Sequence, residues 1–391
     1  VAAVRALQAT TGAERDLLVA LAGRGPRELR QAVIDQLTAL PVTTIAPLAR
    51  AQVKATAAGD LWRAVTRRAH AKPDERAPAL AALTAALPSA TDYERRYRIV
   101  DGIAAVGDAA ALRSLAERFA SWPAGSETTA YKQVAARAIA VNPRPEALEL
   151  IVALATDADP GVRLAALSAI AGATGGDAGP WHGPVGADGL DRVIGTRLAT
   201  DTWPEVRRYA AQVLGTRCSR PGPEAALGDA VARDPDVDVR GDALAALVEC
   251  KAASAPALLA KLWDDSKAPL ELRQRAVDLT VALGDRAVAQ KLVAKYTQWR
   301  GAAIESEAAL ALAQNAAFAI GRLQAPGAAG ALAASLDDAA FPELVAAAAA
   351  GLGLLGPACP PSVRPKLKIL SSSDEQQVAT AARRAYGVCG H

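Results

Sequence analysis

The chain has 391 residues, of which 51% are hydrophobic, 4% are aromatic and 97 are alanine. Alanine is the strongest helix former and lets helices approach closely, so this composition favours packed helices over a sheet. The net charge of +3 comes from 44 basic and 41 acidic side chains that are interspersed, which disfavours a general nucleic-acid-binding role. No apolar run reaches the roughly 18 to 20 residues of a membrane span.

The amino-terminal third, residues 1–133, is predicted to be the less regular part of the chain. Prolines at Pro73, Pro78 and Pro88 interrupt the helical pattern between about 55 and 95. Residues 134–391 are more regular. Because no change in composition marks a boundary, we expect a single elongated domain over residues 1–391.

A short motif recurs along the chain, in which an apolar anchor is followed by small or apolar residues four and eight positions later. One example is Val206, Ala210 and Leu214. Residues four and eight positions apart lie on one face of a helix. From Val206 onward, successive anchors are 33, 33, 40, 32 and 34 residues apart. The anchors are Leu29, Arg98, Val134, Val162, Val206, Val239, Leu272, Leu312, Leu344 and Val378.

A second apolar helical run lies between successive anchors, for example at residues 255–263 and 287–296, and turn residues separate it from the motif. The repeating unit is therefore predicted to be a helical hairpin, with the motif helix first. One hairpin cannot bury its apolar face alone, so we expect the hairpins to stack into a superhelix.

The sequence Asp-Pro-x-Val-Arg at residues 159–163, followed by A-x-x-x-L patterns such as residues 210–214, resembles HEAT repeats. The variety it resembles is the bacterial one called HEAT-like or phycobilin-lyase-type. The resemblance implies an all-α, right-handed α-solenoid of about ten HEAT-like helical hairpins. Such repeats serve as scaffolds, adaptors, bilin lyase subunits and a few DNA-repair glycosylases, so the resemblance specifies fold far better than function.

Arginines follow several anchors directly, and two interpretations are open for them. They could form a ladder for an acidic ligand. The resemblance instead implies structural ties, from arginine to an acidic residue such as Asp157, Asp201 or Asp236 in the same or the next turn, and we favour this interpretation. The arginines are Arg30, Arg163, Arg207, Arg240 and Arg273.

A glycine-rich insertion at residues 172–189 lengthens the spacing between two anchors to 44 residues. Seven of its 18 residues are glycine, so we expect a loop on the rim with Trp181 and His182 at its centre. Trp181 and His182 are candidate partner-binding residues at the loop tip, although Trp181 could instead fold back to cover a hairpin end. His182 lacks the companions that a metal site needs.

The four cysteines fall into two pairs. Cys218 and Cys250 follow their anchors by 12 and 11 residues, and Cys359 and Cys389 follow theirs by 15 and 11. Equivalent positions in neighbouring stacked units favour disulfides Cys218–Cys250 and Cys359–Cys389 over four packed free thiols. Disulfides would indicate an oxidising compartment, either the periplasm, the cell envelope or the exterior.

A candidate partner-binding strip lies in the second helices of two adjacent units. The resemblance implies that second helices line the concave face, where these residues would offer a basic and aromatic surface to an acidic protein segment or a polysaccharide. Trp263 could instead belong to the core. The strip consists of Lys261, Trp263, Lys291, Lys295, Tyr296 and Trp299.

Catalytic and metal-binding motifs are not found. The sequence lacks H-E-x-x-H, the phosphate-binding G-x-x-x-x-G-K-[ST], G-x-S-x-G and Cys-x-x-Cys, and it has three histidines, so we expect neither catalysis, nor a metal, nor a cofactor. The arginine-rich segment at residues 93–98 is the best local match to a DNA-facing patch. It does not match the glycosylases residue by residue.

The function we favour is a non-catalytic scaffold or adaptor in the bacterial envelope or periplasm. It would present its concave face or rim to another protein, without nucleic acid or a membrane span. The absence of an initiator methionine leaves room for a lipid anchor on an upstream segment. The alternatives are a non-catalytic carboxy-terminal portion of a larger exported enzyme, such as a metallopeptidase, and a ligand-handling solenoid of the lyase or glycosylase type.

Overall fold

A computed structural model describes residues 1–7, 11–173, 181, 187–218 and 221–389. These residues form 23 α-helices and five short 3₁₀ helices, with no strand among them. The chain divides into two compact units, unit 1 over Val1–Arg197 and unit 2 over Leu198–His391. The division falls within helix α12 (Ala187–Thr200), directly after the predicted insertion.

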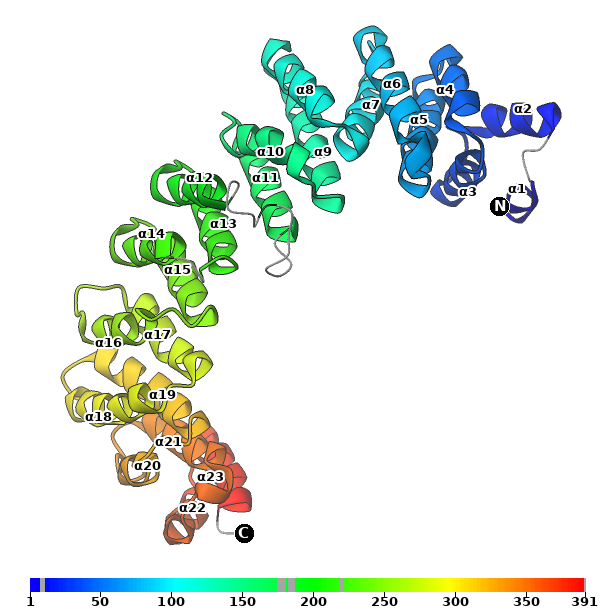
Figure 1. The fold of residues 1–391 in the computed structure, drawn as a ribbon. Helices are drawn as coiled ribbons and strands as arrows, with labels where there is room; N and C mark the ends of the chain where they lie inside the picture. The colour runs from blue at the N-terminus through cyan, green and yellow to red at the C-terminus, as the bar shows by residue number, and fades with distance from the viewer. Residues whose placement is uncertain (8–10, 174–180, 182–186, 219–220, 390–391) are drawn as a thin grey trace. The chain divides into compact units, whose positions relative to one another are not determined.

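Unit 1 contains two layers of helices (Figure 1). The first layer carries most of the anchors of this part of the chain, and its helices are α3 (Arg27–Thr38), α5 (Ala55–Ala71), α7 (Tyr93–Val106), α9 (Ser126–Val141) and α11 (Pro160–Ala173). The second layer holds α4 (Val42–Ala51), α6 (Arg76–Ala86), α8 (Ala109–Ser121) and α10 (Leu148–Ala155). Two further helices, α1 (Ala2–Ala6) and α2 (Gly12–Leu21), pack against α3.

Unit 2 repeats this arrangement (Figure 1). Its motif layer consists of α13 (Pro204–Gly215), α15 (Val237–Glu249), α17 (Leu270–Leu283), α19 (Glu307–Arg322), α21 (Pro342–Leu354) and α23 (Gln376–Val388). Its second layer consists of α14 (Pro221–Arg233), α16 (Ala255–Asp264), α18 (Arg286–Ala302), α20 (Ala328–Ser335) and α22 (Arg364–Leu370). The 3₁₀ helices are Pro73–Glu75, Leu87–Ser89, Pro145–Ala147, Gly356–Ala358 and Pro361–Val363.

Local sequence explains where these helices begin. Asp236 caps α15 by accepting hydrogen bonds from the backbone N–H groups of Asp238 and Val239, at 3.0 and 3.1 Å. Such caps satisfy amide groups that have no partner inside the helix. Proline occupies the first turn of α13 and α21, where the missing N–H costs nothing.

The anchor pattern describes most of the core correctly, although the anchors Leu29 and Arg98 are only half-buried. Val206, Ala210 and Leu214 of α13 are all fully buried, and the equivalent residues Val239, Ala243 and Leu247 of α15 are buried as well. Apolar side chains at this spacing form one stripe, and burying each large one stabilises the fold by about 1.5 to 3 kcal/mol. The all-α fold of stacked helical hairpins is therefore confirmed.

The order of the helices within a hairpin differs from the prediction. From α15 onward, each motif helix of unit 2 packs more on the second-layer helix before it than on the one after it, as α15 does on α14, so the motif helix is the second of its hairpin. The prediction failed because both helices are apolar and the turns on either side of a motif helix are similarly short. The motif helices also pack more closely on one another than the second-layer helices do, which makes the motif layer the concave layer of unit 2.

Glycine and alanine allow this close packing. A Cβ atom on Gly321 of α19 would collide with the backbone of Gly351 on α21, and a Cβ on Gly351 would collide with the carbonyl oxygen of Ala317. The helix backbones touch directly at this point. Only glycine can occupy both positions without moving the helices apart.

Candidate functional site

The arginines that follow the anchors are structural ties. Arg207 donates to both carboxylate oxygens of Asp234, at 2.8 and 2.9 Å, and to the carbonyl oxygen of Asp201 at 2.9 Å. Arg30 makes a similar paired contact with Asp60, at 2.6 and 2.9 Å. Each pair links one motif helix to the next repeat, so these guanidiniums are already engaged and do not form a ligand ladder.

The other three arginines of this set donate to backbone carbonyl groups. Arg163 donates to Asp157 and Ala158, both at 2.9 Å. Arg240 donates to the carbonyl oxygen of Val231 at 2.8 Å, and Arg273 donates to that of Trp263 at 2.9 Å. The structural interpretation therefore holds, and for Arg207 the acidic partner is the carboxylate of the following turn.

A buried carboxylate connects three consecutive motif helices of unit 2. Asp242 of α15 accepts from Arg208 of α13 at 2.9 Å and from Arg275 of α17 at 2.6 Å. Burial acts to raise the pKa of Asp242, but the hydrogen bonds from the two arginines outweigh it and hold that pKa below its ordinary value. The carboxylate therefore stays charged and fixes the spacing of α13, α15 and α17.

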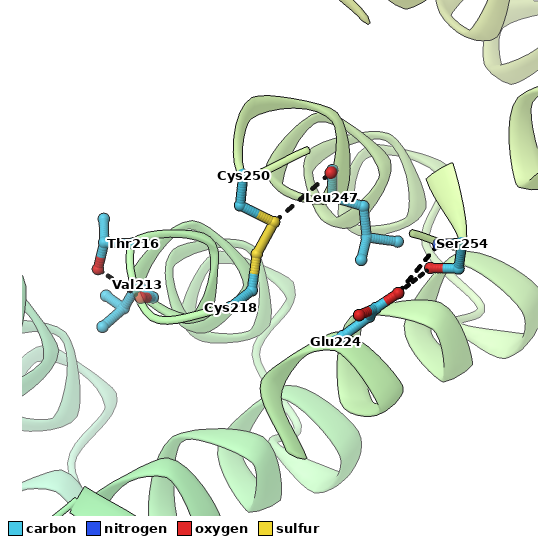
Figure 2. The surroundings of a disulfide bond; sticks show 7 residues. All are labelled: Val213, Thr216, Cys218, Glu224, Leu247, Cys250 and Ser254. Atoms are coloured by element: carbon cyan, nitrogen blue, oxygen red, sulfur yellow. Dashed lines mark hydrogen bonds between the residues drawn. A yellow bond between two sulfur atoms is a disulfide. The ribbon is translucent and has the colours of Figure 1, made fainter. Parts of the chain in front are cut away.

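Both predicted cysteine pairs are disulfides in the structure. Cys218 and Cys250 have their Cα atoms 6.2 Å apart, and Cys359 and Cys389 have theirs 4.9 Å apart. Figure 2 shows Cys218–Cys250 joining the ends of α13 and α15, beside a second link in which Ser254 donates to Glu224 at 2.7 Å. The other disulfide joins the ends of α21 and α23 in the same way.

The predicted basic and aromatic strip is not a surface. Trp263, Tyr296 and Trp299 are buried, with exposed fractions of 1%, 0% and 6%, and the Tyr296 hydroxyl bonds Ser335 at 2.5 Å. Their helices, α16 and α18, belong to the second layer rather than the concave one, and the aromatic rings point into the core. The prediction was wrong because it placed these helices on the concave face.

The lysines of that strip have different surroundings. Lys261 and Lys291 are exposed, and Lys295 forms an ion pair with Asp264. With the rings buried, these lysines lack the aromatic surface that would make them a binding strip.

Trp181 covers the core of unit 1 instead of marking a loop tip. Its side chain is 1% exposed, and its indole N–H donates to the carbonyl oxygen of Arg144 at 2.9 Å. It therefore cannot anchor a partner without leaving the core. His182, the other candidate of the insertion, lies outside the described residues.

Three exposed apolar side chains gather elsewhere, in a groove across α19, α21 and α23 with a volume of about 1440 Å³. Phe318, Leu354 and Val388, one from each helix, are 44%, 43% and 43% exposed. The groove floor consists of small residues, namely Ala346, Ala347, Ala350, Gly353, Ala381 and Ala385. We name this surface the carboxy-terminal groove.

The two edges of the carboxy-terminal groove differ in charge. Arg322 and Arg384 lie toward the carboxyl ends of α19 and α23, near the exposed apolar side chains. Glu343 lies in the first turn of α21, and Glu375 immediately precedes α23. The groove therefore has a basic edge, along which the exposed apolar side chains also lie, and an acidic edge toward the amino ends of α21 and α23.

The sequence contains a weak signal for this groove. Helix α21 has the sequence PELVAAAAAGLGL, which is apolar on nearly every face, so some of its apolar surface must stay outside the core. Phe318 and Val388 lie on its two neighbours. Reasoning from anchors misses them because an anchor pattern identifies the buried stripe only.

The described part of the chain provides no other kind of site. It holds no group of three or more His, Cys, Asp or Glu side chains that could bind a metal ion. It also contains no helix that is both long and apolar enough to cross a membrane.

Comparison with known proteins supports the repeat assignment. Residues 192–279 match the family model of HEAT repeats. No curated protein sequence matches the chain. Among solved structures, Kap95p in a structure with RanGDP has a TM-score of 0.60 at 14% identity, and the match covers 96% of this chain and 55% of that one.

Two structures of Kap121p are also similar. With karyopherin Kap121p bound to the SUMO protease Ulp1p the TM-score is 0.57 at 14% identity, covering 98% of this chain and 48% of that one. For Kap121p bound to Pho4p the TM-score is 0.56 at 14% identity, and the match covers 94% of this chain and 48% of that one. The chain spans about half the length of these proteins. It therefore has an all-α fold of HEAT-like helical hairpins similar to the karyopherin solenoids, with residues 192–279 matching HEAT repeats directly.

Proposed function

We propose that this chain is a non-catalytic scaffold that binds an amphipathic helix of another protein in the carboxy-terminal groove. The single observation that carries the proposal is the alignment of three exposed apolar side chains, Phe318, Leu354 and Val388, along one groove on consecutive helices. Large apolar side chains gathered in a concave surface are typical of protein-binding sites.

The spacing of the groove suits a helical partner. Packed helices lie about 8 to 10 Å apart, so apolar groups on successive motif helices recur at roughly that distance. A helix rises about 1.5 Å per residue, and residues i and i+7 on one face are therefore about 10.5 Å apart. The alanine and glycine floor leaves room for a helix between the larger side chains.

The charged edges define the partner further. Acidic side chains on one side of the partner helix would face Arg322 and Arg384, and basic side chains on the other side would face Glu343 and Glu375. Complementary charges of this kind select the partner and its orientation more than they raise affinity.

The groove is held in shape before a partner arrives. The Cys359–Cys389 disulfide joins the ends of α21 and α23, and direct backbone contact holds α19 against α21. A preformed surface lowers the ordering cost of binding. The structures of Kap121p bound to Ulp1p and to Pho4p are of protein complexes, which agrees with a binding role for a related fold.

We further propose that the chain works in an oxidising compartment, the periplasm or cell envelope of a bacterium or the cell exterior. The support is the pair of disulfides, Cys218–Cys250 and Cys359–Cys389, because such bonds persist mainly outside reducing compartments.

The test uses a displayed library of amphipathic helical peptides selected on the full chain. The affinity of a selected peptide is then measured by fluorescence anisotropy against Phe318→Ser and Leu354→Ser. The matched control is Ile369→Ser on α22, which removes an exposed apolar side chain (69% exposed) outside the groove. We expect each groove variant to weaken binding at least tenfold and the control to bind as the unaltered chain does.

A charge exchange tests orientation in the same assay. Arg384→Glu should weaken a peptide that carries glutamate on the facing edge, and arginine at that peptide position should restore binding. If Leu354→Ser and Ile369→Ser bind the selected peptides equally well, the groove is not the binding site.

A further inference from the structure

The motif layer of unit 1 carries arginines on three successive helices, away from the carboxy-terminal groove. Arg63 lies on α5, Arg98 on α7 and Arg137 on α9. The three helices are packed neighbours in the order α5, α7, α9 (Figure 1). Whether the three guanidiniums share one surface depends on the register of the helices.

The contacts between α5 and α7 place Arg63 beside Arg98. A Cβ on Gly59 of α5 would lie 3.4 Å from Cγ of Arg98, and a Cβ on Gly102 of α7 would lie 2.5 Å from Oγ1 of Thr66. Arg63 lies between Gly59 and Thr66 on α5. It therefore faces α7 between Arg98 and Gly102.

The contacts between α7 and α9 place Arg137 opposite the middle of α7. The rings of Tyr93 and Tyr131 stack with centroids 5.5 Å apart, and the side chain of Asn142 donates to the carbonyl oxygen of Ala105 at 3.2 Å. Arg137 lies midway between these two contacts. Arg63, Arg98 and Arg137 therefore form a row across the three helices.

Two members of the row have no protein partner. Among the described residues neither Arg63 nor Arg137 forms a hydrogen bond or an ion pair, and both side chains are exposed. Arg98 is held in place, because its Nε donates to Glu94 at 3.0 Å and its guanidinium lies 5.2 Å from the centre of the Tyr97 ring. The row therefore has one fixed and two open guanidiniums.

A second acidic group beside the row, Asp101, makes no direct contact with the arginines. Asp101 of α7 is half-buried, and within the described structure it makes no hydrogen bond or ion pair. Burial raises the pKa of Asp101, against the opposing influence of Arg98, Arg63 and Arg137. Burial, followed by the neighbouring charges of Arg98 and Arg67, lowers the pKa of Arg63, and the charges of Asp101 and Asp60 offset this only in part. Arg63 and Arg98 thus repel each other, and an anionic ligand would relieve that repulsion.

We propose that Arg63, Arg98 and Arg137 bind an extended acidic segment of a protein that crosses α5, α7 and α9. Neighbouring helices lie about 8 to 10 Å apart, and an extended chain advances about 3.3 Å per residue. Carboxylates three residues apart would therefore reach successive arginines, each able to form paired hydrogen bonds with a guanidinium.

A nucleic-acid strand fits this row less well. It carries one charge about every 3.4 Å along each strand of a duplex, so several phosphates would fall between the arginines. Those phosphates would also come close to Glu94 and Asp101 of α7, of which Glu94 accepts a hydrogen bond from Arg98. Spaced carboxylates avoid this repulsion.

The test measures binding of a fluorescein-labelled peptide with glutamate at every third position to the full chain at low salt. Arg63→Gln and Arg137→Gln should each weaken binding about tenfold, the loss expected for one charge-assisted contact. The control is Arg113→Gln on α8, which removes the same charge from a side chain that is 62% exposed. It should bind as the unaltered chain does.

Three results would overturn the proposal. One is an equal loss in Arg113→Gln, which would mean that net charge alone attracts the peptide. The second is equal binding of a peptide of the same composition with contiguous glutamates. The third is tighter binding of single-stranded DNA with the same sensitivity to the variants. Arg63→Lys keeps the positive charge, so binding that Arg63→Gln loses and Arg63→Lys retains is lost through the missing contact and not through unfolding. Leu354→Ser, in the carboxy-terminal groove, should leave binding of the acidic peptide unchanged.

Discussion

Arg207 and Asp234 form a nearly buried pair in which the guanidinium donates to both carboxylate oxygens, at 2.8 and 2.9 Å, with side chains only 8% and 6% exposed. Arg207 belongs to α13 and Asp234 to the turn before α15, so the pair holds one repeat to the next. The stack is therefore joined by directed polar contacts as well as by apolar burial.

Removing one member of this pair should be far more damaging than removing an exposed ion pair. Asp234→Ala leaves a buried guanidinium without its carboxylate, and we expect a loss of about 3 to 5 kcal/mol in the free energy of unfolding. Asp229→Ala breaks the exposed pair with Arg233 and should cost about 1 kcal/mol or less. Urea unfolding followed by circular dichroism compares the two, and equal midpoints would contradict the assignment.

The buried Asp242 should make the stability of unit 2 dependent on pH. The pKa of Asp242 is lower in the folded chain than in the unfolded chain. Its contribution to the free energy of unfolding is therefore fully present above the unfolded pKa of 3.8 and is lost as pH falls through the folded pKa. We therefore expect Asp242→Asn to be less stable than the unaltered chain by a constant amount between pH 5 and 8, where the charge is constant. The difference should shrink below about pH 3.8. A difference that grows on acidification would contradict this sign.

The two disulfides should each stabilise the chain appreciably. They close loops with sequence separations of 32 and 30 residues, for which the chain-entropy relation gives about 3 to 4 kcal/mol each. Reduction, or serine at both cysteines of a pair, should lower the unfolding midpoint. Intact mass after alkylation and non-reducing peptide mapping should find no free thiol and the pairs Cys218–Cys250 and Cys359–Cys389. Ready alkylation of the native protein would remove the support for an oxidising compartment.

Glycine-to-alanine substitutions should have opposite effects at two positions of unit 2. Gly321→Ala places a methyl group against the backbone of α21, and we expect a loss of about 1 to 3 kcal/mol or more because neither helix can yield without moving the other. Gly330→Ala, on α20 with open space around it, should stabilise the chain by about 0.5 to 1 kcal/mol. Thermal unfolding of both variants tests the close packing of α19 and α21. Equal shifts of the unfolding temperature in the two variants would contradict it.

Much of the fold could be predicted because spacing determines which residues share a helix face. The anchors Val206, Val239 and Leu344 repeat at nearly constant intervals, and all three are buried in motif helices. The cysteine pairs could be predicted for the same reason, since equivalent positions in successive repeats are neighbours in space. Helix α5 escapes the anchor pattern, although it packs between α3 and α7 like any other motif helix.

The site could not be predicted because exposure depends on how helices pair. The sequences around Trp263 and Phe318 are both apolar and helical, yet the first side chain is 1% exposed and the second 44%. Only the packing of α16 into the second layer and of α19 into the concave layer separates them. The row formed by Arg63, Arg98 and Arg137 likewise arises from register between helices whose arginines are more than 30 residues apart.

The placement of the disulfides also determines where unit 2 opens. Repeat stacks commonly fray from their ends, because a terminal repeat has one neighbour only. In unit 2 the Cys218–Cys250 bond joins the first two motif helices and Cys359–Cys389 joins the last two, while α17 and α19 have no covalent link to a neighbour. Amide hydrogen exchange should therefore be slow in the disulfide-linked helices α13, α15, α21 and α23. Within unit 2 the first cooperative opening should occur at the α17–α19 contact.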